Sequence, residues 1–279
     1  QVGRTTEMQI DRRRFYEPDA IFKDVENRLA KTLESNQRID YLTFVPDGEP
    51  TLDINLGQEI SRLKTLNVPV GVITNSSLIG RADVRKDLAR ADWVSLKIDA
   101  AQDTTWRKIN RPHKNLRRLT IQEGLLEFAS TFKGCLVTET MLVSGYNDHD
   151  ECTGATADFI SRLKPSVAYL SIPTRPPDDK RVQAPDEARL NWAYQLFAAR
   201  GLQVEYLIGY EGNAFAYSGD VEQDILKITA VHPMRKEALS ALLSRAGAKW
   251  TLIDQLVARG DLKVTEYDNH QFFLRRIKR

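Results

Sequence analysis

One stretch of sequence decides the fold: Tyr41-Leu42-Thr43-Phe44-Val45-Pro46-Asp47-Gly48-Glu49-Pro50-Thr51-Leu52. Residues 41–45 read as a β-strand, a polar turn follows, and a helical pattern begins near Leu56. In α/β proteins, ligands bind at the loops that follow the carboxyl ends of strands. Gly48 lets the backbone approach a ligand closely, and Pro50 stiffens the exit from the turn. Glu49 can then hold a cation such as an α-amino group, although a plain structural acidic turn is the alternative interpretation.

The composition indicates an ordinary globular chain with room for one large domain and one small one. Of its 279 residues, 42% are hydrophobic and 28% are charged, which argues against a disordered or a membrane protein. Apolar runs stay well short of the roughly 18 residues that cross a bilayer. The two cysteines, Cys135 and Cys152, have neither a metal-binding spacing nor a disulfide pattern, so we expect an inert role for both and a cytoplasmic location.

Charge is distributed unevenly along the chain. Residues 232–279 contain 10 Lys and Arg against 5 Asp and Glu, a net charge of +5. Because the whole chain carries +2, the remainder carries −3. A basic segment beside a mildly acidic body suggests two domains with different partners, and we predict them at residues 1–222 and 223–279.

Strands and helices alternate regularly through the larger domain. After a first helix at residues 19–33, the pattern predicts strands at 41–45, 68–74, 93–99, 135–142, 167–172 and 203–208, separated by helices near 55–66, 83–90, 120–132, 159–163 and 186–200. Thr120 and Glu123 read as a capping box at the start of the helix predicted near residues 120–132. Such alternation is typical of a parallel sheet covered by helices, and the predicted fold is α/β, a partial (β/α) barrel.

The strand at residues 93–99 has two different faces. Val94, Leu96 and Ile98 alternate with Ser95, Lys97 and Asp99. Because the outer face of a barrel strand packs on helices, the polar set should point into the barrel.

A buried lysine costs several kcal/mol unless it is paired. Lys97 therefore indicates a ligand site, or else an internal ion pair with Asp99 or Glu139. Glu139 and Tyr169 interrupt other apolar strands, and a polar Thr-Arg-Pro-Pro loop follows the fifth strand at residues 174–177. Polar groups thus converge on the end of the sheet where Glu49 lies, which favours a ligand site.

The chain resembles the radical S-adenosylmethionine (SAM) superfamily, and within it the iron–sulfur oxidoreductases related to wyosine-base synthases and glycyl-radical activating enzymes. The resemblance runs from residue 1 to about residue 215 and lies in four short motifs: Asp47-Gly48-Glu49-Pro50, Thr74-Asn75-Ser76, Ser95-Leu96-Lys97-Ile98-Asp99 and Ile109-Asn110-Arg111-Pro112.

In that family, a Gly-Gly-Glu-type turn after the second strand binds the methionyl amino group of SAM. Here Asp47 replaces the first glycine of this turn, which continues with Gly48, Glu49 and Pro50. The resemblance implies that Asn75, Ser95 and Lys97 hold the ribose and carboxylate of SAM, with Arg175 as a further contact. Glu139 and Tyr169 are candidates for substrate binding.

The family's Cys-x3-Cys-x2-Cys loop, which ligates a 4Fe-4S cluster, is absent from this sequence. We expect a truncated chain whose cluster ligands lie upstream of Gln1 and which is inactive by itself; a natural homologue without a cluster is the alternative. The resemblance implies that the intact enzyme cleaves SAM reductively to a 5′-deoxyadenosyl radical. The resemblance also implies an electron donor such as flavodoxin or ferredoxin. The substrate is not identified, and RNA and a protein or peptide are the candidates.

The C-terminal segment has a pattern of its own. Helices are predicted at residues 235–245 and 251–259, followed by a hairpin of residues 261–267 and 271–277. This order resembles a winged helix, and the positive charge allows nucleic-acid binding. The second helix is a weak recognition helix, however, since it contains Asp254 and Gln255. A non-catalytic protein that binds nucleic acid or peptide through this module is therefore the alternative function.

Overall fold

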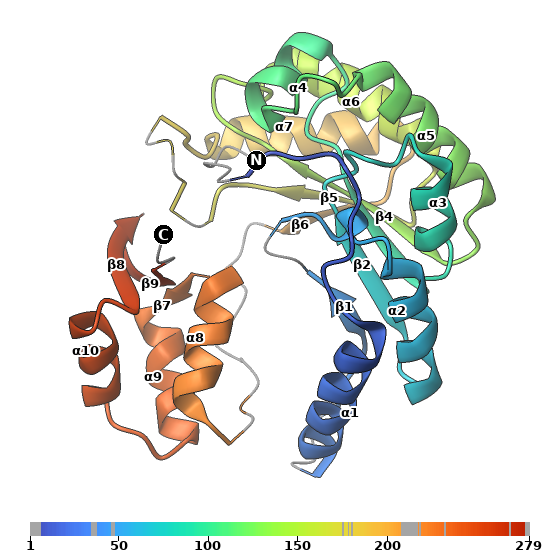
Figure 1. Cartoon of the computed structure of the whole chain (residues 1–279). Coiled ribbons are helices and arrows are strands. Elements are labelled where there is room, and N and C mark those ends of the chain that lie inside the picture. Colours follow the sequence, from blue (N-terminus) through green and yellow to red (C-terminus); the bar gives the residue numbers. More distant parts are fainter. Residues whose placement is uncertain are drawn as a thin grey trace. The chain divides into compact units, whose positions relative to one another are not determined.

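The computed structural model describes residues 7–34, 38–45, 48–174, 176–177, 179, 181–207, 217, 219–231, 233–267 and 269–276. The chain separates into two compact units (Figure 1). The first is drawn from Gln1–Val25, Ile39–Pro173 and Pro177–Gly209, and the second from Glu26–Arg38, Thr174–Pro176 and Tyr210–Arg279. The domain boundary at residues 222 and 223 stays a prediction. Within the described part of the chain, no helix combines the length and the apolar character needed to cross a membrane.

The first unit contains a six-stranded parallel sheet whose strands follow one another in the order of the sequence. The strands are β1 (Leu42–Phe44), β2 (Val70–Thr74), β3 (Trp93–Lys97), β4 (Cys135–Met141), β5 (Val167–Ser171) and β6 (Val204–Leu207). Because all of them run in the same direction, their carboxyl ends meet at one edge. The α/β fold with a partial barrel that the sequence predicts is thereby confirmed.

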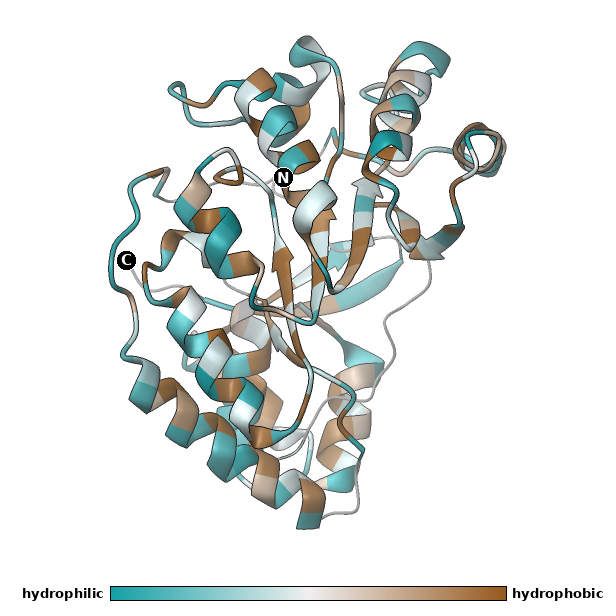
Figure 2. Cartoon of the chain, turned by 90° about the vertical axis from the view of Figure 1, so that its right-hand side faces the viewer, coloured by the Kyte–Doolittle hydropathy of each residue, from teal (hydrophilic) through white to brown (hydrophobic). Residues whose placement is uncertain are grey.

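Helices cover one face of this sheet (Figure 1). They are α2 (Leu56–Leu63), α3 (Ala82–Leu88), α4 (Asp103–Asn110), α5 (Arg118–Thr131), α6 (Asp150–Leu163) and α7 (Glu187–Ala198), with short 3-10 turns η1 (Pro50–Leu52) and η2 (Lys64–Leu66). Helix α1 (Pro18–Glu34) is divided between the units, and its residues Ile21, Phe22 and Val25 pack against the core of the first. The core lies between the two layers: Val94 and Leu96 of β3 are completely buried, as is Ile60 of α2. Figure 2 shows hydrophobic and hydrophilic residues alternating around the helices, as in amphipathic helices packed on a sheet.

Two local predictions differ from the structure. Helix α5 begins at Arg118, and its N-cap, Arg117, makes no side-chain capping bond. The capping box was therefore wrong: Thr120 already lies inside the helix, where its hydroxyl cannot cap the first turn. Helix α4 was not predicted at all, because its short sequence places only Thr105, Trp106 and Ile109 in the interior.

The second unit has its own small core. It contains α8 (Val221–Val231), β7 (Met234–Arg235), α9 (Lys236–Arg245), α10 (Thr251–Ala258), β8 (Leu262–Tyr267) and β9 (His270–Arg275). The three strands pair antiparallel in the order β7-β9-β8. Leu239, Ile253 and Phe273 are among its buried residues. The two helices and the hairpin agree with the sequence pattern, and the winged-helix assignment stays a prediction.

Helix α5 approaches the chain around Ile79 so closely that only glycine fits at position 124. A Cβ at Gly124 would lie 2.4 Å from the Ile79 carbonyl oxygen and 2.7 Å from the Gly80 Cα. We expect Gly124→Ala to lower the free energy of unfolding by about 1–3 kcal/mol, the usual cost of overpacking. Gly154 of α6 is the matched control, because a Cβ there would meet only the flexible end of Arg200 at 3.4 Å. Urea denaturation of both variants checks this, and equal losses would contradict it.

A second prediction concerns Glu59 of α2, which is 2% exposed. Burial and then the charge of Asp53 raise the pKa of Glu59 to about 7. Because the folded-state pKa of Glu59 lies above the unfolded one, the contribution of Glu59 to stability is most favourable at low pH and becomes less favourable as the pH rises toward 7. We expect Glu59→Gln to stabilise the protein, with an advantage that grows by about 2 kcal/mol between pH 5 and pH 8. Urea titrations at the two pH values measure it, and an advantage independent of pH would contradict it.

Candidate functional site

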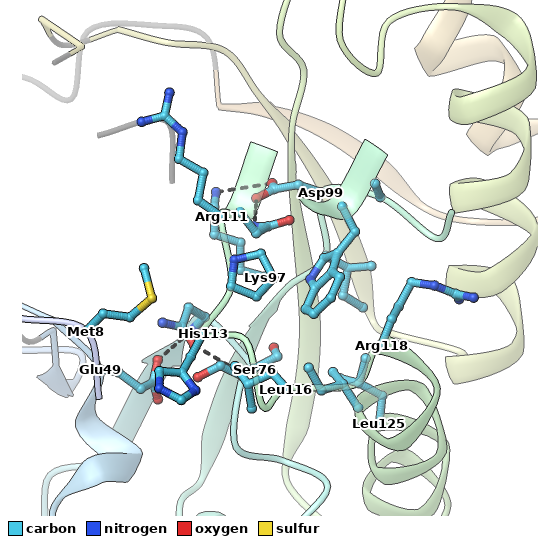
Figure 3. Close-up of a pocket in the computed structure, with 18 of the residues that line it drawn as sticks. Met8, Glu49, Ser76, Lys97, Asp99, Arg111, His113, Leu116, Arg118 and Leu125 are labelled. Atoms are coloured by element: carbon cyan, nitrogen blue, oxygen red, sulfur yellow. Dashed lines mark hydrogen bonds and ion pairs between the residues drawn. The ribbon is translucent and has the colours of Figure 1, made fainter. Parts of the chain in front are cut away.

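A cavity lies at the carboxyl edge of the sheet (Figure 3). Its wall includes Glu49, which follows β1, and Asn75 and Ser76, which follow β2. Lys97 and Asp99 contribute the end of β3 and the residues after it. Parallel strands bring these separate segments together because their carboxyl ends share one edge. The structure therefore has a cavity at the same edge of the sheet where the sequence predicts a ligand site.

Glu49 is buried in the wall of the cavity, 9% exposed. Its Oε1 atom accepts hydrogen bonds from Thr51 N (3.1 Å), Thr51 Oγ1 (2.7 Å) and Thr74 Oγ1 (2.6 Å), and its Oε2 atom accepts one from Asn75 N (2.7 Å). Burial raises the pKa of Glu49, and these hydrogen bonds only partly oppose the shift. No lysine, arginine or histidine of the described residues forms an ion pair with it. Such a carboxylate suits a cation supplied by a ligand.

Lys97 joins two carboxylates beside the cavity. Its Nζ atom lies 3.2 Å from Glu139 Oε1 and 3.4 Å from Asp99 Oδ1. Burial lowers the pKa of Lys97, but the charges of Asp99 and Glu139 outweigh it and raise the pKa. Ser171 Oγ also donates to Glu139, at 2.9 Å. Both pairings that the sequence left open are thus present, and Lys97 still lines the cavity.

Asp99 organises the other side of this cluster. Its Oδ1 atom accepts a hydrogen bond from Met141 N (2.9 Å), and its Oδ2 atom accepts one from Asn110 Nδ2 (2.8 Å). Burial raises the pKa of Asp99, but the charge of Lys97 outweighs that effect and lowers it. Asp99 is therefore ionised at neutral pH, and the three charges of Lys97, Asp99 and Glu139 sum to −1.

Three buried polar atoms of the cavity wall have no hydrogen-bond partner among the described residues: Ser76 Oγ, Asn110 Oδ1 and Arg118 Nε, the last of which lies 3.8 Å from Asp103 Oδ1 in an ion pair. Ser76 is 1% exposed and has a positive φ of 64°. Most buried polar groups in native proteins are hydrogen-bonded. Three orphaned atoms around one cavity therefore indicate a polar ligand.

The structure places four of the ten residues that the sequence nominated in the wall of the cavity. Gly48, Glu49, Asn75 and Lys97 line the cavity. Pro50 is buried at the start of η1, where it supports the turn. The placement of Asp47 and Arg175 lies outside the described residues.

The other nominated residues lie on the sheet. Ser95 is buried in β3. Glu139 reaches the cavity only through Lys97. Tyr169 is the register neighbour of Glu139 and is half-buried; burial and then the charge of Glu205 raise its pKa.

Sequence reasoning assigned no role in the site to five residues that complete it: Thr51, Thr74, Ser76, Asn110 and Arg118. Three of them, Thr74, Ser76 and Asn110, do stand in the motifs that carry the family resemblance. Thr74 and Ser76 flank Asn75 at a strand end, so a polar strand-end motif was a usable signal for both. Arg118 opens α5, and its Nη1 atom donates to the Ala101 carbonyl at 2.6 Å. Nothing in its sequence context marks it as part of the site.

The residues present fit an iron–sulfur cluster poorly. No group of three His, Cys, Asp or Glu side chains in the described ranges could hold a metal ion. Cys135 lies at the start of β4, and the buried Cys152 lies in α6 with its Sγ atom 3.0 Å from Thr105 Oγ1. The chain has only these two cysteines, so no step through a cluster is derived from it.

Comparison with known proteins agrees with this geometry. The family model of the radical SAM superfamily matches residues 5–153. The chain therefore belongs to the radical SAM superfamily. Over 280 aligned residues, it is 44% identical to the UPF0026 protein MJ1312 of Methanocaldococcus jannaschii, a match that covers 100% of this chain and 87% of that protein.

Two solved structures share the fold. A radical SAM methyltransferase of Sphaerobacter thermophilus has a TM-score of 0.54 at 16% identity, over 73% of this chain and 61% of that one. SuiB of Streptococcus suis, bound to S-adenosylmethionine, has a TM-score of 0.52 at 12% identity, over 68% of this chain and 43% of that one. This chain thus covers less than two thirds of the length of either protein.

Proposed function

We propose that the cavity binds SAM and that this chain is the SAM-binding barrel of a radical SAM enzyme. The observation that carries the proposal is the buried carboxylate of Glu49, which faces the cavity without a cationic partner among the described residues. Membership of the superfamily supports SAM as the ligand.

Charge favours SAM in this cavity. The ligand carries a sulfonium, an ammonium and a carboxylate, and its net charge is therefore +1. In its ionised form Glu49 contributes −1, and the cluster of Lys97, Asp99 and Glu139 contributes another −1. Arg111 and Arg118 also line the cavity, but each forms an ion pair with an aspartate outside its lining, Asp179 and Asp103. In a partly buried site with a low effective dielectric constant, such complementarity is worth more than in water.

Individual roles follow from the geometry. Glu49 would hold the α-amino group, as the turn Asp47-Gly48-Glu49-Pro50 of the superfamily motif implies. Lys97 uses two of its three N–H donors on carboxylates, and the third would serve the SAM carboxylate. Asn75 and Ser95 would support the ribose side.

The orphaned atoms of Ser76, Asn110 and Arg118 offer hydrogen bonds to the hydroxyl groups and heteroatoms of the ligand. We do not assign the SAM carboxylate to Arg111, because its Nη2 atom is held 3.0 Å from Asp179 Oδ2.

The substrate would lie beside SAM on the concave face of the sheet. Glu139 keeps 25% of its side chain exposed there, and Tyr169 is its neighbour on β5. We assign both to substrate binding, with the substrate itself unidentified.

In the superfamily, the bound SAM is cleaved reductively to a 5′-deoxyadenosyl radical. Because the described residues offer no cluster site, the role proposed for this chain is the binding and orientation of SAM and substrate. The superfamily implies that a 4Fe-4S cluster and an electron donor supply the electron for the cleavage.

The second unit gives little support to the nucleic-acid alternative. The exposed residues of α10 are Thr251, Asp254, Gln255, Val257 and Ala258, none of them basic. Arg259, just beyond it, lies 2.6 Å from Glu222 and 3.0 Å from Asp261, so its charge is engaged. A recognition helix that binds phosphates normally presents free Lys or Arg side chains. We therefore do not advance nucleic-acid binding as the function.

The experiment is anaerobic reconstitution of the intact protein with iron and sulfide, followed by reduction with dithionite in the presence of SAM. We expect SAM binding and formation of 5′-deoxyadenosine, measured by liquid chromatography. A reconstituted protein that neither binds SAM nor forms 5′-deoxyadenosine would overturn the proposal.

A further inference from the structure

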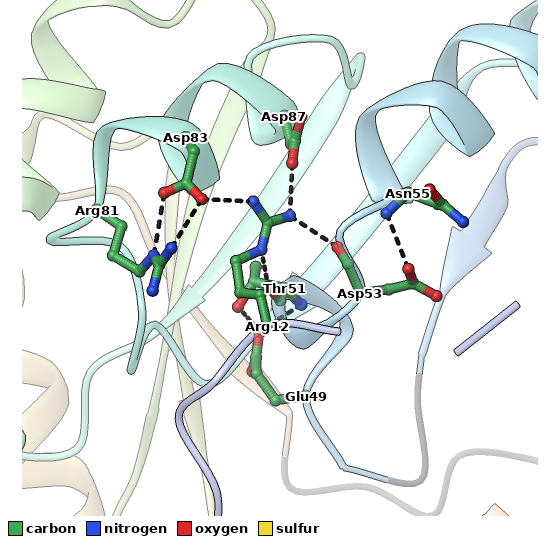
Figure 4. A network of polar contacts seen from close by, with 8 residues as sticks. All are labelled: Arg12, Glu49, Thr51, Asp53, Asn55, Arg81, Asp83 and Asp87. Carbon is green, nitrogen blue, oxygen red and sulfur yellow. Dashed lines mark hydrogen bonds and ion pairs between the residues drawn. The ribbon is translucent and has the colours of Figure 1, made fainter. Parts of the chain in front are cut away.

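A buried arginine fixes the turn that carries Glu49. Arg12 lies in the irregular segment before α1, yet its side chain is only 5% exposed. Its Nε atom donates to the Thr51 carbonyl oxygen at 2.8 Å, and its Nη2 atom donates to the Asp53 carbonyl oxygen at 2.7 Å. Its guanidinium also contacts Asp83 Oδ2 at 2.9 Å and Asp87 Oδ2 at 2.6 Å (Figure 4). Arg12 therefore connects the η1 turn to α3.

The Thr51 residue is held from two sides. Its amide and hydroxyl donate to Glu49 Oε1, while its carbonyl oxygen accepts from Arg12. A shift of the guanidinium would move the Thr51 peptide and, through it, the carboxylate of Glu49. Arg12 does not itself line the cavity, so it can affect a ligand there only through its neighbours.

The same segment also covers the cavity. Glu7, Met8 and Gln9 line it, only a few residues before Arg12. Asp53 anchors the segment independently, because its Oδ2 atom accepts from the amides of Phe15 (3.3 Å) and Tyr16 (3.1 Å). Loss of Arg12 should therefore loosen the turn without releasing the whole segment.

A guanidinium suits this position better than an ammonium. The planar fork of arginine can donate to two carbonyl oxygens and two carboxylates in fixed directions, whereas lysine offers a single point of attachment. A buried cation also needs its partners in good geometry, since desolvation otherwise outweighs the attraction. Asp83 and Asp87 supply that compensation.

We infer that Arg12 is a positioning residue for the SAM site, which acts through the Thr51 peptide to hold Glu49 in its binding geometry. The identity of the ligand, SAM, rests on the proposed function, whereas the role of Arg12 in fixing the turn of residues 49–53 does not. It predicts that Arg12 and Glu49 are energetically coupled, and that the coupling runs through residues 49–53.

The test is a double-mutant cycle on the full chain. SAM affinity is measured by calorimetry for wild type, Arg12→Gln, Glu49→Gln and the double variant. We expect Arg12→Gln alone to weaken binding by about 10- to 100-fold, the range that loss of an orienting partner costs at metal sites. In the Glu49→Gln background, the same substitution should change affinity less than about threefold, because coupled residues are non-additive. Equal losses in both backgrounds would overturn the inference.

Two further variants separate positioning from simple destabilisation. Arg14→Gln is the matched control, since Arg14 lies on the same segment, has a side chain that is 61% exposed and, among the residues that the structure describes, forms an ion pair only with Glu17. It should leave SAM affinity unchanged, and a loss as large as that of Arg12→Gln would overturn the inference. Arg12→Lys keeps the charge and should recover part of the SAM affinity. If Arg12→Gln folds poorly, Arg12→Lys takes its place in the double-mutant cycle.

Hydrogen exchange decides the structural part even if the chain does not bind SAM. In ligand-free protein, amides of residues 49–55 should exchange faster in Arg12→Gln than in Arg14→Gln, while amides of β4 and β5 exchange alike. Unchanged exchange at residues 49–55 would overturn the inference, whereas failure of wild type to bind SAM would count only against the proposed function.

Discussion

Replacing Glu49 by glutamine is expected to weaken SAM binding by about 100-fold or more. Truncating one member of a buried, hydrogen-bonded charge pair typically costs about 2–5 kcal/mol. The amide keeps the size of the side chain but removes the charge that would face the α-amino group. The amide nitrogen cannot accept the hydrogen bond that Glu49 Oε2 takes from Asn75 N, but removal of a buried charge without a cationic partner offsets that loss, so the free energy of unfolding should change little. Calorimetric titration with SAM and urea denaturation measure the two effects.

Glu59→Gln is the matched control for this experiment. Glu59 is as buried as Glu49, and its pKa is also raised, yet it does not line the cavity. Its substitution should leave SAM affinity unchanged. A loss of less than about threefold in Glu49→Gln, or an equal loss in both variants, would contradict the assignment of Glu49.

The pH dependence of SAM affinity is a second test of the role assigned to Glu49. Burial raises the pKa of Glu49 above its ordinary value of 4.5. Since only the ionised carboxylate attracts an ammonium, affinity should begin to fall at a higher pH than it would for an exposed glutamate. This part of the pH profile should disappear in Glu49→Gln.

Replacing Lys97 by methionine is expected to lower the free energy of unfolding by about 3–5 kcal/mol at pH 7, the cost of breaking a buried ion pair from one side. The substitution leaves Asp99, 2% exposed, and Glu139 beside each other without their shared cation. Lys64→Met is the control, because Lys64 and Asp92 form an exposed pair at 2.6 Å with 41% and 36% of their side chains accessible. Such a pair is worth about 0–1 kcal/mol.

The effect of Lys97→Met should depend on pH in a defined direction. In the wild-type protein, the lowered pKa of Asp99 contributes stability above its unfolded pKa and loses it as the pH falls through the folded value. The variant lacks this contribution, so the gap between the two proteins should narrow as the pH falls below the ordinary Asp pKa of 3.8 and Asp99 becomes protonated. Urea titrations from neutral pH down to below pH 3.8 measure the gap. Equal losses for Lys97→Met and Lys64→Met would contradict the account.

The architecture of the first unit followed from sequence because its signals are local. The alternation of Val94, Leu96 and Ile98 with Lys97 fixes which face of β3 packs on helices, and strand polarity then places Glu49 and Lys97 at one edge. Both line the same cavity. This is the geometry on which the SAM proposal depends.

Residues whose role depends on distant contacts escaped prediction. The importance of Arg12 comes from Thr51, Asp83 and Asp87, which lie 39, 71 and 75 positions away, and its own segment has no periodicity. Asn110 and Arg118 enter the cavity because α4 and α5 return to the strand ends. Chain topology brings these residues together. The motif at residues 109–112 marks Asn110 without giving it a role, and no local pattern marks Arg12 or Arg118.

The most direct test of the central claim is an experimental structure of this chain with SAM bound. The account predicts SAM in the cavity at the carboxyl edge of the sheet, with its α-amino nitrogen within hydrogen-bond distance of Glu49, about 2.7–3.2 Å. SAM bound elsewhere, or bound in the cavity with its amino group away from Glu49, would contradict it.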